Sequence, residues 1–406
     1  MESTPRGLRR HIALFGKTNS GKSMLFNLLT GCDNAIVSEK AGTTTDPVLK
    51  NMELLPFGPV TLIDTAGLDD TTELGKKRIK KTRDVSRRAD IGLMLADVNE
   101  INNANINGVD YKDIFSGKKI DVFTKCDLIN SQDLKNIKEQ FPNAVFVSQD
   151  DPQSIELLKN TLVQTLKEIE VSDEDSLICS LVPRGGTVVM AVSIDSEAPK
   201  GRLILPQVQL IRDCLDHGVK VCVTRETELK ETLAVVSAVD LVVADSQIFN
   251  IVNNIVPANI PLTSFSILLA HQKGNFKQLL KGIDQIKNLK NNDPILILEA
   301  CTHNHTHEDI GRVKIPALLE KYTGKKFNFH FFSGYNINEN PNEYSMAILC
   351  GSCMINKAEL QTRLKLLSEN NIPVTNYGII LAFLNGILER CTGIFTGANN
   401  FDRTAL

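Results

Sequence analysis

The sequence has no apolar run long enough to cross a bilayer. Its longest apolar segments, such as residues 378–384, are far shorter than the roughly 20 residues that a membrane helix needs. Residues 1–10 also lack the apolar core and the small-residue cleavage site of a secretory signal. We therefore expect a cytoplasmic protein without a membrane partner.

An excess of basic charge is absent as well. The chain has 45 lysines and arginines against 48 aspartates and glutamates, which gives a net charge of −3. Domains that bind nucleic acid are usually basic, so we expect no nucleic-acid partner. Residues 71–88 are rich in lysine and arginine and offer a nucleic-acid patch as an alternative. We interpret them as a solvated helix face.

Disulfides are not expected among the nine cysteines, because a cytoplasmic chain keeps its thiols reduced. Metal ligands or buried thiols are the remaining interpretations. Cys179, Cys214 and Cys222 lack ligand spacing. Cys222 lies in a predicted strand and is expected to act as a small buried hydrophobic residue.

A phosphate-binding loop begins at Gly16. A short apolar run, residues 11–15, precedes it, and helical spacing follows in residues 24–29, so the loop has the strand–loop–helix context that phosphate binding requires. The glycines let backbone N–H groups turn toward the phosphates, Lys22 reaches the β- and γ-phosphates, and the Ser23 hydroxyl binds Mg²⁺. The residues predicted to contact the nucleotide here are Gly16, Asn19, Ser20, Gly21, Lys22, Ser23 and Met24.

A second nucleotide motif follows an apolar strand at residues 60–63. It reads Asp-Thr-Ala-Gly and starts at Asp64. Asp64 is expected to hold Mg²⁺ through water, and the N–H of Gly67 to sense the γ-phosphate.

The third motif selects the base. Residues 124–127 read Thr-Lys-Cys-Asp and resemble the Asn-Lys-x-Asp guanine motif of GTPases. Asp127 can accept hydrogen bonds from guanine N1 and N2, where adenine has no matching donors. Thr124 and Lys125 complete the motif, and Thr124 in place of asparagine is expected to brace the loop more weakly. Ser148 lies where the last base-contacting loop is expected. We therefore predict binding of GTP and GDP with Mg²⁺.

The switch region indicates a subclass. Leu68 stands where Ras-like proteins place a glutamine that orients the attacking water. Residues 42–46, Gly-Thr-Thr-Thr-Asp, resemble the Gly-Thr-Thr-Arg-Asp switch of TrmE, Era and EngA, with Thr45 in place of the arginine. That resemblance implies that Thr44 binds Mg²⁺ in the catalytic site and that Asn19 binds K⁺. We expect slow GTP hydrolysis that K⁺ accelerates; the alternative for Asn19 is a simple turn residue.

The middle of the chain predicts a small α/β sheet without a second phosphate loop. Residues 171–176 form a polar linker, and predicted strands at 187–192, 219–223 and 241–244 alternate with a helix at 206–215. Residues 193–202 combine charged side chains with a proline directly after a strand. Such a loop lies at the carboxyl edge of a sheet, where ligand sites form, although a solvated loop is the alternative.

Two cysteine groups end strands in the last third of the chain. Residues 294–300 run into Cys301, and residues 346–349 run into Cys350, which begins a Cys-Gly-Ser-Cys turn that ends at Cys353. Thiolates at this spacing favour Zn²⁺ or an iron–sulfur cluster. A redox dithiol at Cys350 and Cys353 is a further alternative, but it does not explain Cys301 or His303. His305 and His307 are interpreted as solvated.

The order of these motifs is similar to that of the FeFe-hydrogenase maturation GTPases, the HydF family. The shared pattern is a TrmE-like GTPase segment, then Asp-Ser-Glu-Ala-Pro-Lys-Gly-Arg-Leu, Cys-x-His and Cys-x-x-Cys. The resemblance implies a 4Fe–4S cluster on Cys301, Cys350 and Cys353 and a role as scaffold for a transient di-iron subcluster precursor. It also implies a homodimer formed through the middle domain, with radical-SAM maturases and the apo-FeFe-hydrogenase as partners.

The fourth iron ligand departs from the family pattern. Leu349 occupies the place of a family histidine and cannot bind iron. His303, Asp195 and an external ligand remain as the expected alternatives. A labile ligand there would suit transfer of a precursor.

The sequence thus predicts an α/β protein of three domains. These are a P-loop GTP-binding domain at 1–172, a small α/β dimerisation domain at 176–265 and an α/β iron–sulfur domain at 266–406. The predicted function is a GTP-hydrolysing scaffold for cofactor assembly. The alternative is a TrmE-like tRNA-modification or ribosome-assembly GTPase with a structural zinc site, and the acidic balance of the chain disfavours both.

Overall fold

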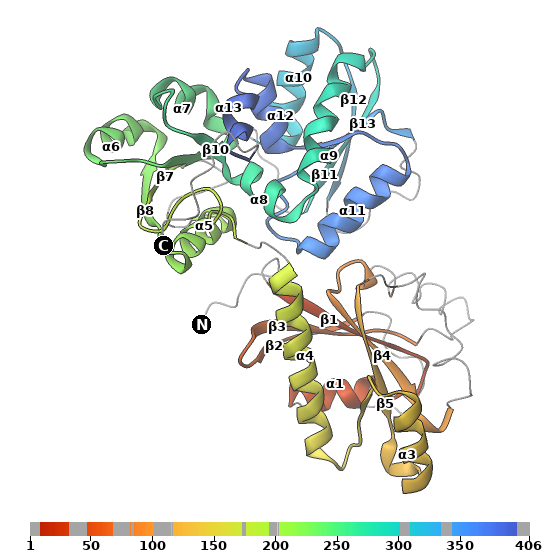
Figure 1. Cartoon of the computed structure of the whole chain (residues 1–406). Coiled ribbons are helices and arrows are strands. Elements are labelled where there is room, and N and C mark those ends of the chain that lie inside the picture. The colour runs from red at the N-terminus through yellow and green to blue at the C-terminus, as the bar shows by residue number, and fades with distance from the viewer. Residues whose placement is uncertain are drawn as a thin grey trace. The chain divides into compact units, whose positions relative to one another are not determined.

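The computed structural model describes residues 9–31, 47–67, 82, 85–100, 115, 117–172, 176–194, 201, 203–300, 309–333 and 343–395, and for residues 170–172 it describes the backbone alone. The chain divides into two compact units, Met1–Glu174 and Asp175–Leu406. Both units are built from α/β layers (Figure 1), which confirms the predicted fold class.

The first unit contains a six-stranded sheet in the order β2-β3-β1-β4-β5-β6. Only β2 runs antiparallel to its neighbour β3. The strands are β1 (Arg10–Gly16), β2 (Val48–Leu54), β3 (Gly58–Asp64), β4 (Ile91–Asp97), β5 (Lys118–Thr124) and β6 (Val145–Phe146). The described helical elements are α1 (Lys22–Thr30), η2 (Val98–Glu100), η4 (Cys126–Leu128), α3 (Ser131–Gln140) and α4 (Pro152–Ser172).

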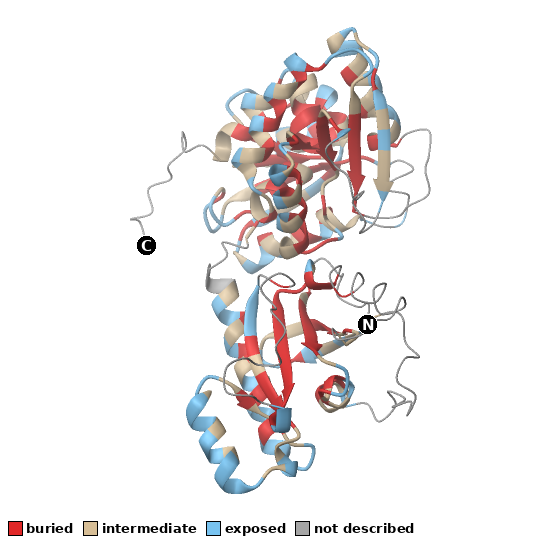
Figure 2. Ribbon diagram, turned by 90° about the vertical axis from the view of Figure 1, so that its right-hand side faces the viewer, coloured by how far each residue is buried: buried red, intermediate tan, exposed pale blue. Residues whose placement is uncertain are grey.

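The central strands β1, β3 and β4 are mostly apolar because the sheet is buried on both faces. Ile12 and Leu14 of β1 belong to the core beneath α1 and α4, while Ala13 and Phe15 belong to the core on the opposite face. Figure 2 shows this sheet as largely buried. Since β1, β3, β4 and β5 are parallel, their carboxyl ends lie along one edge of the sheet. The predicted nucleotide motifs follow those ends.

The second unit contains two parallel four-stranded sheets, in the orders β10-β9-β7-β8 and β12-β11-β13-β14. The strands are β7 (Thr187–Val192), β8 (Lys220–Arg225), β9 (Leu241–Ala244), β10 (Leu262–Ser264), β11 (Pro294–Glu299), β12 (Asn328–Ser333), β13 (Met346–Leu349) and β14 (Val374–Asn376). The α-helices are α5 (Leu205–Asp216), α6 (Leu229–Val235), α7 (Phe249–Ile255), α8 (Phe265–Lys273), α9 (Phe276–Lys281), α10 (Ile315–Thr323), α11 (Lys357–Glu369), α12 (Tyr377–Leu384) and α13 (Leu388–Thr392). The other helical elements are the 3₁₀ helices η5 (Glu226–Glu228), η6 (Ser246–Ile248), η7 (Gly282–Asn288) and η10 (Gly393–Phe395) and the π-helix η8 (Ile310–Lys314).

One apolar core joins the two sheets of this unit. Val189 and Val242 of the first sheet belong to the same buried cluster as Ile297 and Ile348 of the second. The apolar residues of α12 complete this cluster. Among the described residues, no helix is long and apolar enough to cross a membrane. The division of the chain into three domains stays a prediction.

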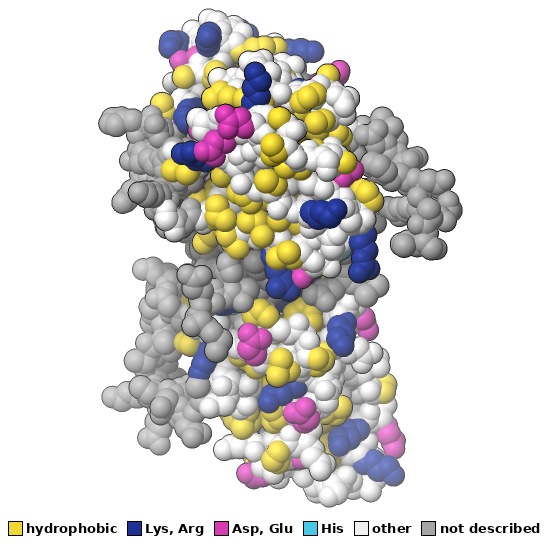
Figure 3. Space-filling model, turned by 90° about the vertical axis from the view of Figure 1, so that its left-hand side faces the viewer, with side chains coloured by type: hydrophobic (Ala, Val, Ile, Leu, Met, Phe, Trp, Pro, Cys, Tyr) yellow, Lys and Arg dark blue, Asp and Glu magenta, His cyan; other side chains and the backbone are white. Residues whose placement is uncertain are grey.

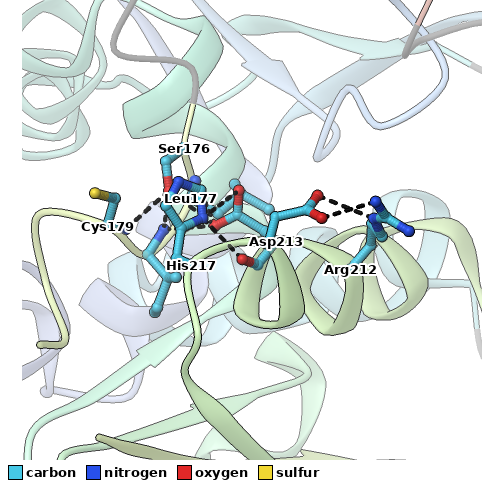
Figure 4. Close-up of polar contacts among 8 residues, drawn as sticks. Ser176, Leu177, Cys179, Arg212, Asp213 and His217 are labelled. Carbon is cyan, nitrogen blue, oxygen red and sulfur yellow. Dashed lines mark hydrogen bonds and ion pairs between the residues drawn. The ribbon is translucent and has the colours of Figure 1, made fainter. Parts of the chain in front are cut away.

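A single carboxylate on α5 fixes the chain where the second unit begins (Figure 4). Asp213 Oδ2 accepts hydrogen bonds from Ser176 Oγ (2.9 Å) and from the N–H groups of Leu177 and Ile178 (3.0 Å each). At the C-cap of this helix, His217 Nδ1 lies 3.7 Å from Asp213 Oδ1. Burial raises the pKa of Asp213, against the lowering effect of its bonds to Ser176 and the neighbouring chain.

Candidate nucleotide site and candidate metal centre

The phosphate loop turns through two left-handed residues, Asn19 (φ 62°) and Gly21 (φ 82°). Glycine suits position 21, because a Cβ there would also lie 3.1 Å from the side chain of Thr124. The Lys22 ammonium donates to Gly16 O at 3.1 Å and to Lys17 O. It therefore lies across the loop in the position that a phosphate-binding lysine takes.

Ser23 and Asp64 lie side by side at the predicted Mg²⁺ site. Ser23 Oγ donates to Asp64 Oδ2 at 3.0 Å, and Asp64 Oδ1 is buried without a hydrogen-bond partner among the described residues. Burial raises the pKa of Asp64, while Ser23 and Lys22 lower it. Hydroxyl and carboxylate oxygens are the ligands that Mg²⁺ prefers, so the pair fits this ion. Gly67 is half-buried beyond Asp64, and Thr44 lies outside the described residues.

Thr124 contacts the phosphate loop through its hydroxyl group, and the weaker bracing expected from its replacing asparagine stays a prediction. Its Oγ1 lies at the end of β5, 2.9 Å from Ser20 O and 3.2 Å from Ala96 O, and can donate to either carbonyl. The next residue, Lys125, has a left-handed backbone (φ 59°) and pairs with Asp97 at 2.7 Å. The short threonine side chain can reach Ser20 O because the phosphate loop lies close to the end of β5.

Asp127 and Ser148 lie together although they are far apart in the sequence. Ser148 Oγ donates to Asp127 Oδ1 at 3.2 Å, and Val147 N donates to Phe123 O at 2.7 Å. Both predicted guanine-contacting residues are therefore at the same edge. Asp127 is exposed, Met24 is half-buried on α1, and Asn19 is exposed on the phosphate loop.

The Cys-x-x-Cys turn begins directly after β13. Cys350 N donates to Leu298 O at 2.9 Å, and Cys350 Sγ accepts a hydrogen bond from Ala300 N at 3.1 Å. Ser352 has a left-handed backbone (φ 55°) and donates through Oγ to Cys350 O at 3.2 Å. Leu349 is buried in the core.

Cys350 and Cys353 line a cavity of about 170 Å³ within the second unit. It lies where strands of both sheets end, because Ser193 follows β7, Asp245 follows β9 and Glu299 closes β11. Ligand sites of parallel sheets form at such carboxyl ends. Sequence reasoning missed the acidic lining residues Asp245, Glu299 and Asp309; the signal that could have found the first two is an acid at the end of an apolar strand or directly after it.

The chemistry of the two thiols suits a soft metal centre. Burial raises the pKa of Cys350, and burial with the neighbouring Cys350 raises the pKa of Cys353 to about 11. The free thiols are therefore protonated at neutral pH, and a metal must displace their protons. A backbone N–H donated to sulfur is also a feature of iron–sulfur sites. The pair fits the predicted cluster as two of its ligands.

The third and fourth predicted ligands cannot be placed. Cys301, His303 and Asp195 lie outside the described residues, and within the described ranges no group of three or more histidine, cysteine, aspartate or glutamate side chains is placed to hold a metal ion. Among the other cysteines, Cys214 is buried, Cys222 is half-buried against the core and Cys179 is exposed.

Hydrogen bonds fix both flanks of the segment that contains Asp195. Asp245 accepts from Ser193 N (2.9 Å) and from Gln207 Nε2 (3.2 Å). Gln207 Oε1 in turn accepts from Ile204 N at 3.0 Å. The ends of this segment are thus tied to the cavity wall at Asp245.

Comparison with known families matches three segments of the chain. Residues 11–125 match the 50S ribosome-binding GTPase family, residues 177–274 match the hydrogen maturase F dimerization domain, and residues 277–394 match the hydrogen maturase F tetramerization domain.

Similarity to individual proteins extends over a smaller part of the chain. The tRNA modification GTPase MnmE of Chromobacterium violaceum is 40% identical over 119 residues, 29% of this chain and 26% of its own length. GTPase Der of Kosmotoga olearia is 31% identical over 191 residues, 43% of this chain and 42% of its own length. The solved FeoB G-domain of Methanococcus jannaschii is 21% identical over 39% of this chain and 98% of its own, with a TM-score of 0.30.

The fold, the phosphate loop and the matched segment together define the first unit as a P-loop GTPase domain. The two hydrogen maturase F segments fill residues 177–274 and 277–394 of the second unit. The chain belongs to the hydrogen maturase F family. It spans less than half the length of the MnmE and Der relatives that it matches.

Proposed function

We propose that this chain is a GTP-hydrolysing scaffold that assembles the di-iron subcluster of FeFe-hydrogenase and transfers it to the apo-enzyme. The observation that carries the proposal is the Cys350–Cys353 turn at a cavity inside the region that matches the hydrogen maturase F domains. A tRNA-modification or ribosome-assembly role with a structural zinc would leave that match unexplained.

In the first unit, Lys22 neutralises the β- and γ-phosphates, and Asp127 selects guanine with support from Thr124, Lys125 and Ser148. Ser23, Thr44 and Asp64 hold Mg²⁺, which supplies further charge neutralisation. The phosphate-loop N–H groups orient the phosphates, and Gly67 senses the γ-phosphate.

Hydrolysis is slow because Leu68 cannot orient water, and K⁺ at Asn19 accelerates it. The test is the GTPase rate in K⁺ against Na⁺ at equal ionic strength. Equal rates would remove the K⁺ assignment and leave the GTPase proposal in place.

In the second unit, Cys301, Cys350 and Cys353 hold a 4Fe–4S cluster. Anaerobic reconstitution should give a brown protein that absorbs near roughly 400 nm, whereas Zn²⁺ gives no colour. Cys350→Ser should lose most of the iron, and Cys222→Ser is the matched control that should keep it. A colourless protein that binds stoichiometric zinc would overturn this part of the proposal.

The fourth cluster position is held by Asp195, by His303 or by an exchangeable external ligand. Asp195→Ala should change the EPR spectrum of the reduced cluster if Asp195 is the ligand. An unchanged spectrum assigns the position to one of the other two.

The chain acts as a cytoplasmic homodimer that meets radical-SAM maturases and the apo-hydrogenase. Exposed apolar side chains on the middle elements support self-association, namely Val208, Leu215, Val223 and Val235. Figure 3 shows hydrophobic side chains spread over one face of the second unit. Pull-downs of the partner enzymes with GDP and with a non-hydrolysable GTP analogue test whether the nucleotide controls partner exchange.

A further inference from the structure

Asp97 ends β4 at the edge of the first sheet where the nucleotide motifs lie, but it belongs to none of those motifs. In the sheet it pairs in register with Thr124, the first residue of the guanine motif. Its exposed fraction is 8%. Aspartate is rarely buried this fully unless it has a partner. Specific contacts must therefore hold the carboxylate at this place.

The two carboxylate oxygens of Asp97 serve different partners. Oδ1 accepts hydrogen bonds from Asn99 N at 2.9 Å and from Asn99 Nδ2 at 3.0 Å. Oδ2 lies 2.7 Å from the Lys125 ammonium. The turn with Asn99 fixes the rotation of the carboxylate and so directs the second oxygen toward the lysine. Burial raises the pKa of Asp97, but the bonds from Lys125 and Asn99 hold that pKa below its ordinary value, so the carboxylate is charged at neutral pH.

The backbone of Lys125 is also in an unusual conformation. Its φ of 59° is left-handed, a region that residues other than glycine seldom adopt and that is often found at functional sites. The lysine side chain is 32% exposed, and ion pairs that solvent reaches contribute little to stability. Stability alone therefore does not explain why a buried carboxylate holds this lysine.

The direction of the Lys125 ammonium matters because a second carboxylate is close in the chain. Asp127, two residues further on, is exposed and accepts a hydrogen bond from Ser148 Oγ at 3.2 Å. Guanine N1 and N2 need the Asp127 carboxylate as their acceptor. An ammonium released from Asp97 would be attracted to Asp127 and would compete with the base, since opposite charges attract strongly at short range.

We propose that Asp97 is a positioning residue for guanine selection, because it holds the Lys125 ammonium away from Asp127 and so keeps the Asp127 carboxylate free for the base. Asn99 supports this role by fixing the Asp97 carboxylate. The inference rests on the guanine site proposed above, and it adds a specificity-determining residue that lies on β4, outside the nucleotide motifs.

The test compares the binding of GDP and IDP to the full chain by isothermal titration calorimetry. IDP lacks the 2-amino group, so the ratio of its Kd to that of GDP measures the bond from guanine N2 to Asp127. Asp97→Asn keeps the shape of the side chain but releases Lys125. We expect the Kd for GDP to rise roughly tenfold and the IDP-to-GDP ratio to fall roughly threefold or more. Asp121→Asn is the matched control that should change neither Kd, because Asp121 is a half-buried carboxylate inside β5, three residues before the motif.

A double variant shows whether Asp97 acts through Lys125. In a chain that carries Lys125→Met, no ammonium can reach Asp127, so the addition of Asp97→Asn should leave the IDP-to-GDP ratio unchanged. Structural damage would instead weaken GDP and IDP alike in either background. Equal weakening of both nucleotides by Asp97→Asn, or a fall in the ratio that persists beside Lys125→Met, would overturn the inference.

If Asp97→Asn does not fold, Asn99→Ala decides the question. Asn99 is exposed, and its truncation lets the Asp97 carboxylate rotate, so the ratio should fall in the same direction by a smaller factor. An unchanged ratio would overturn the inference, while a wild-type preference for GDP would keep the guanine site in place. A wild-type chain that binds IDP and ADP as tightly as GDP would overturn the guanine site itself, and this inference with it.

Discussion

Thr124 shows how one hydroxyl connects two nucleotide-binding loops of the GTPase unit. Its Oγ1 reaches Ser20 O on the phosphate loop, and Ser20 precedes Gly21, whose missing Cβ leaves room for the threonine. A shift of one loop therefore displaces the other. Thr124 therefore links the position of the phosphate loop to that of the segment that carries Asp127.

Removing that hydroxyl should weaken nucleotide binding. Thr124→Val keeps the shape of the side chain but leaves Ser20 O without its donor, which costs on the order of 1–2 kcal/mol. We expect the Kd for GDP, measured by isothermal titration calorimetry, to rise roughly fivefold to thirtyfold. Thr30→Val is the control, since Thr30 Oγ1 bonds only within α1. Equal affinities of the wild-type and Thr124→Val proteins would contradict the bracing role.

At the scale of the element, α5 anchors the first residues of the second unit. Asp213→Ala removes the acceptor of Ser176 Oγ and of the N–H groups of Leu177 and Ile178, and should destabilise the second unit by about 1–3 kcal/mol. The measurement is denaturant-induced unfolding. Asp216→Ala on the same helix breaks an exposed pair with Arg212 and should cost less than about 1 kcal/mol. A comparable loss in both variants would contradict the anchoring role.

The same carboxyl should make stability depend on pH. Burial raises the pKa of Asp213 above its ordinary value of 3.8, so the folded state binds this proton more tightly than the unfolded state does. Its contribution to the free energy of unfolding is therefore largest at low pH and falls as the pH rises through the window just above 3.8. The difference between wild type and Asp213→Asn, followed by chemical unfolding across that window, should decrease with rising pH. An increase would show that the bonds to Ser176 and its neighbours outweigh burial.

Strand ends explain which site residues could be found from the sequence. Ser23, Asp64 and Asp127 belong to short motifs that follow apolar strands, and parallel strands place such motifs on one edge, so their proximity could be predicted. Glu299 ends an apolar strand and Asp245 follows one, but the two strands belong to different sheets. Their meeting at one cavity depends on how those sheets pack, which no local pattern encodes.

At the scale of the whole molecule, the two compact units predict separate thermal transitions. GDP with Mg²⁺ at roughly 100 times its Kd should stabilise the first unit by about 2.7 kcal/mol and leave the second unchanged. Differential scanning calorimetry would show one transition moving to higher temperature. ADP and the variant Lys22→Ala are the controls that should move neither. Joint movement of both transitions would mean that nucleotide binding is coupled energetically to the second unit.

The sequence by itself determined those features whose conformation depends on residues adjacent in the chain. The phosphate loop, the guanine motif and the Cys-x-x-Cys turn each lie within a few residues, and their backbone geometry follows from local glycines and strand ends. Only the tertiary structure decided which distant groups surround them. Lys273 lies 82 residues from its partner Ile355, and Asp213 lies 37 residues from Ser176. Such pairs form because apolar cores bring whole elements together, and that packing energy is spread over many side chains.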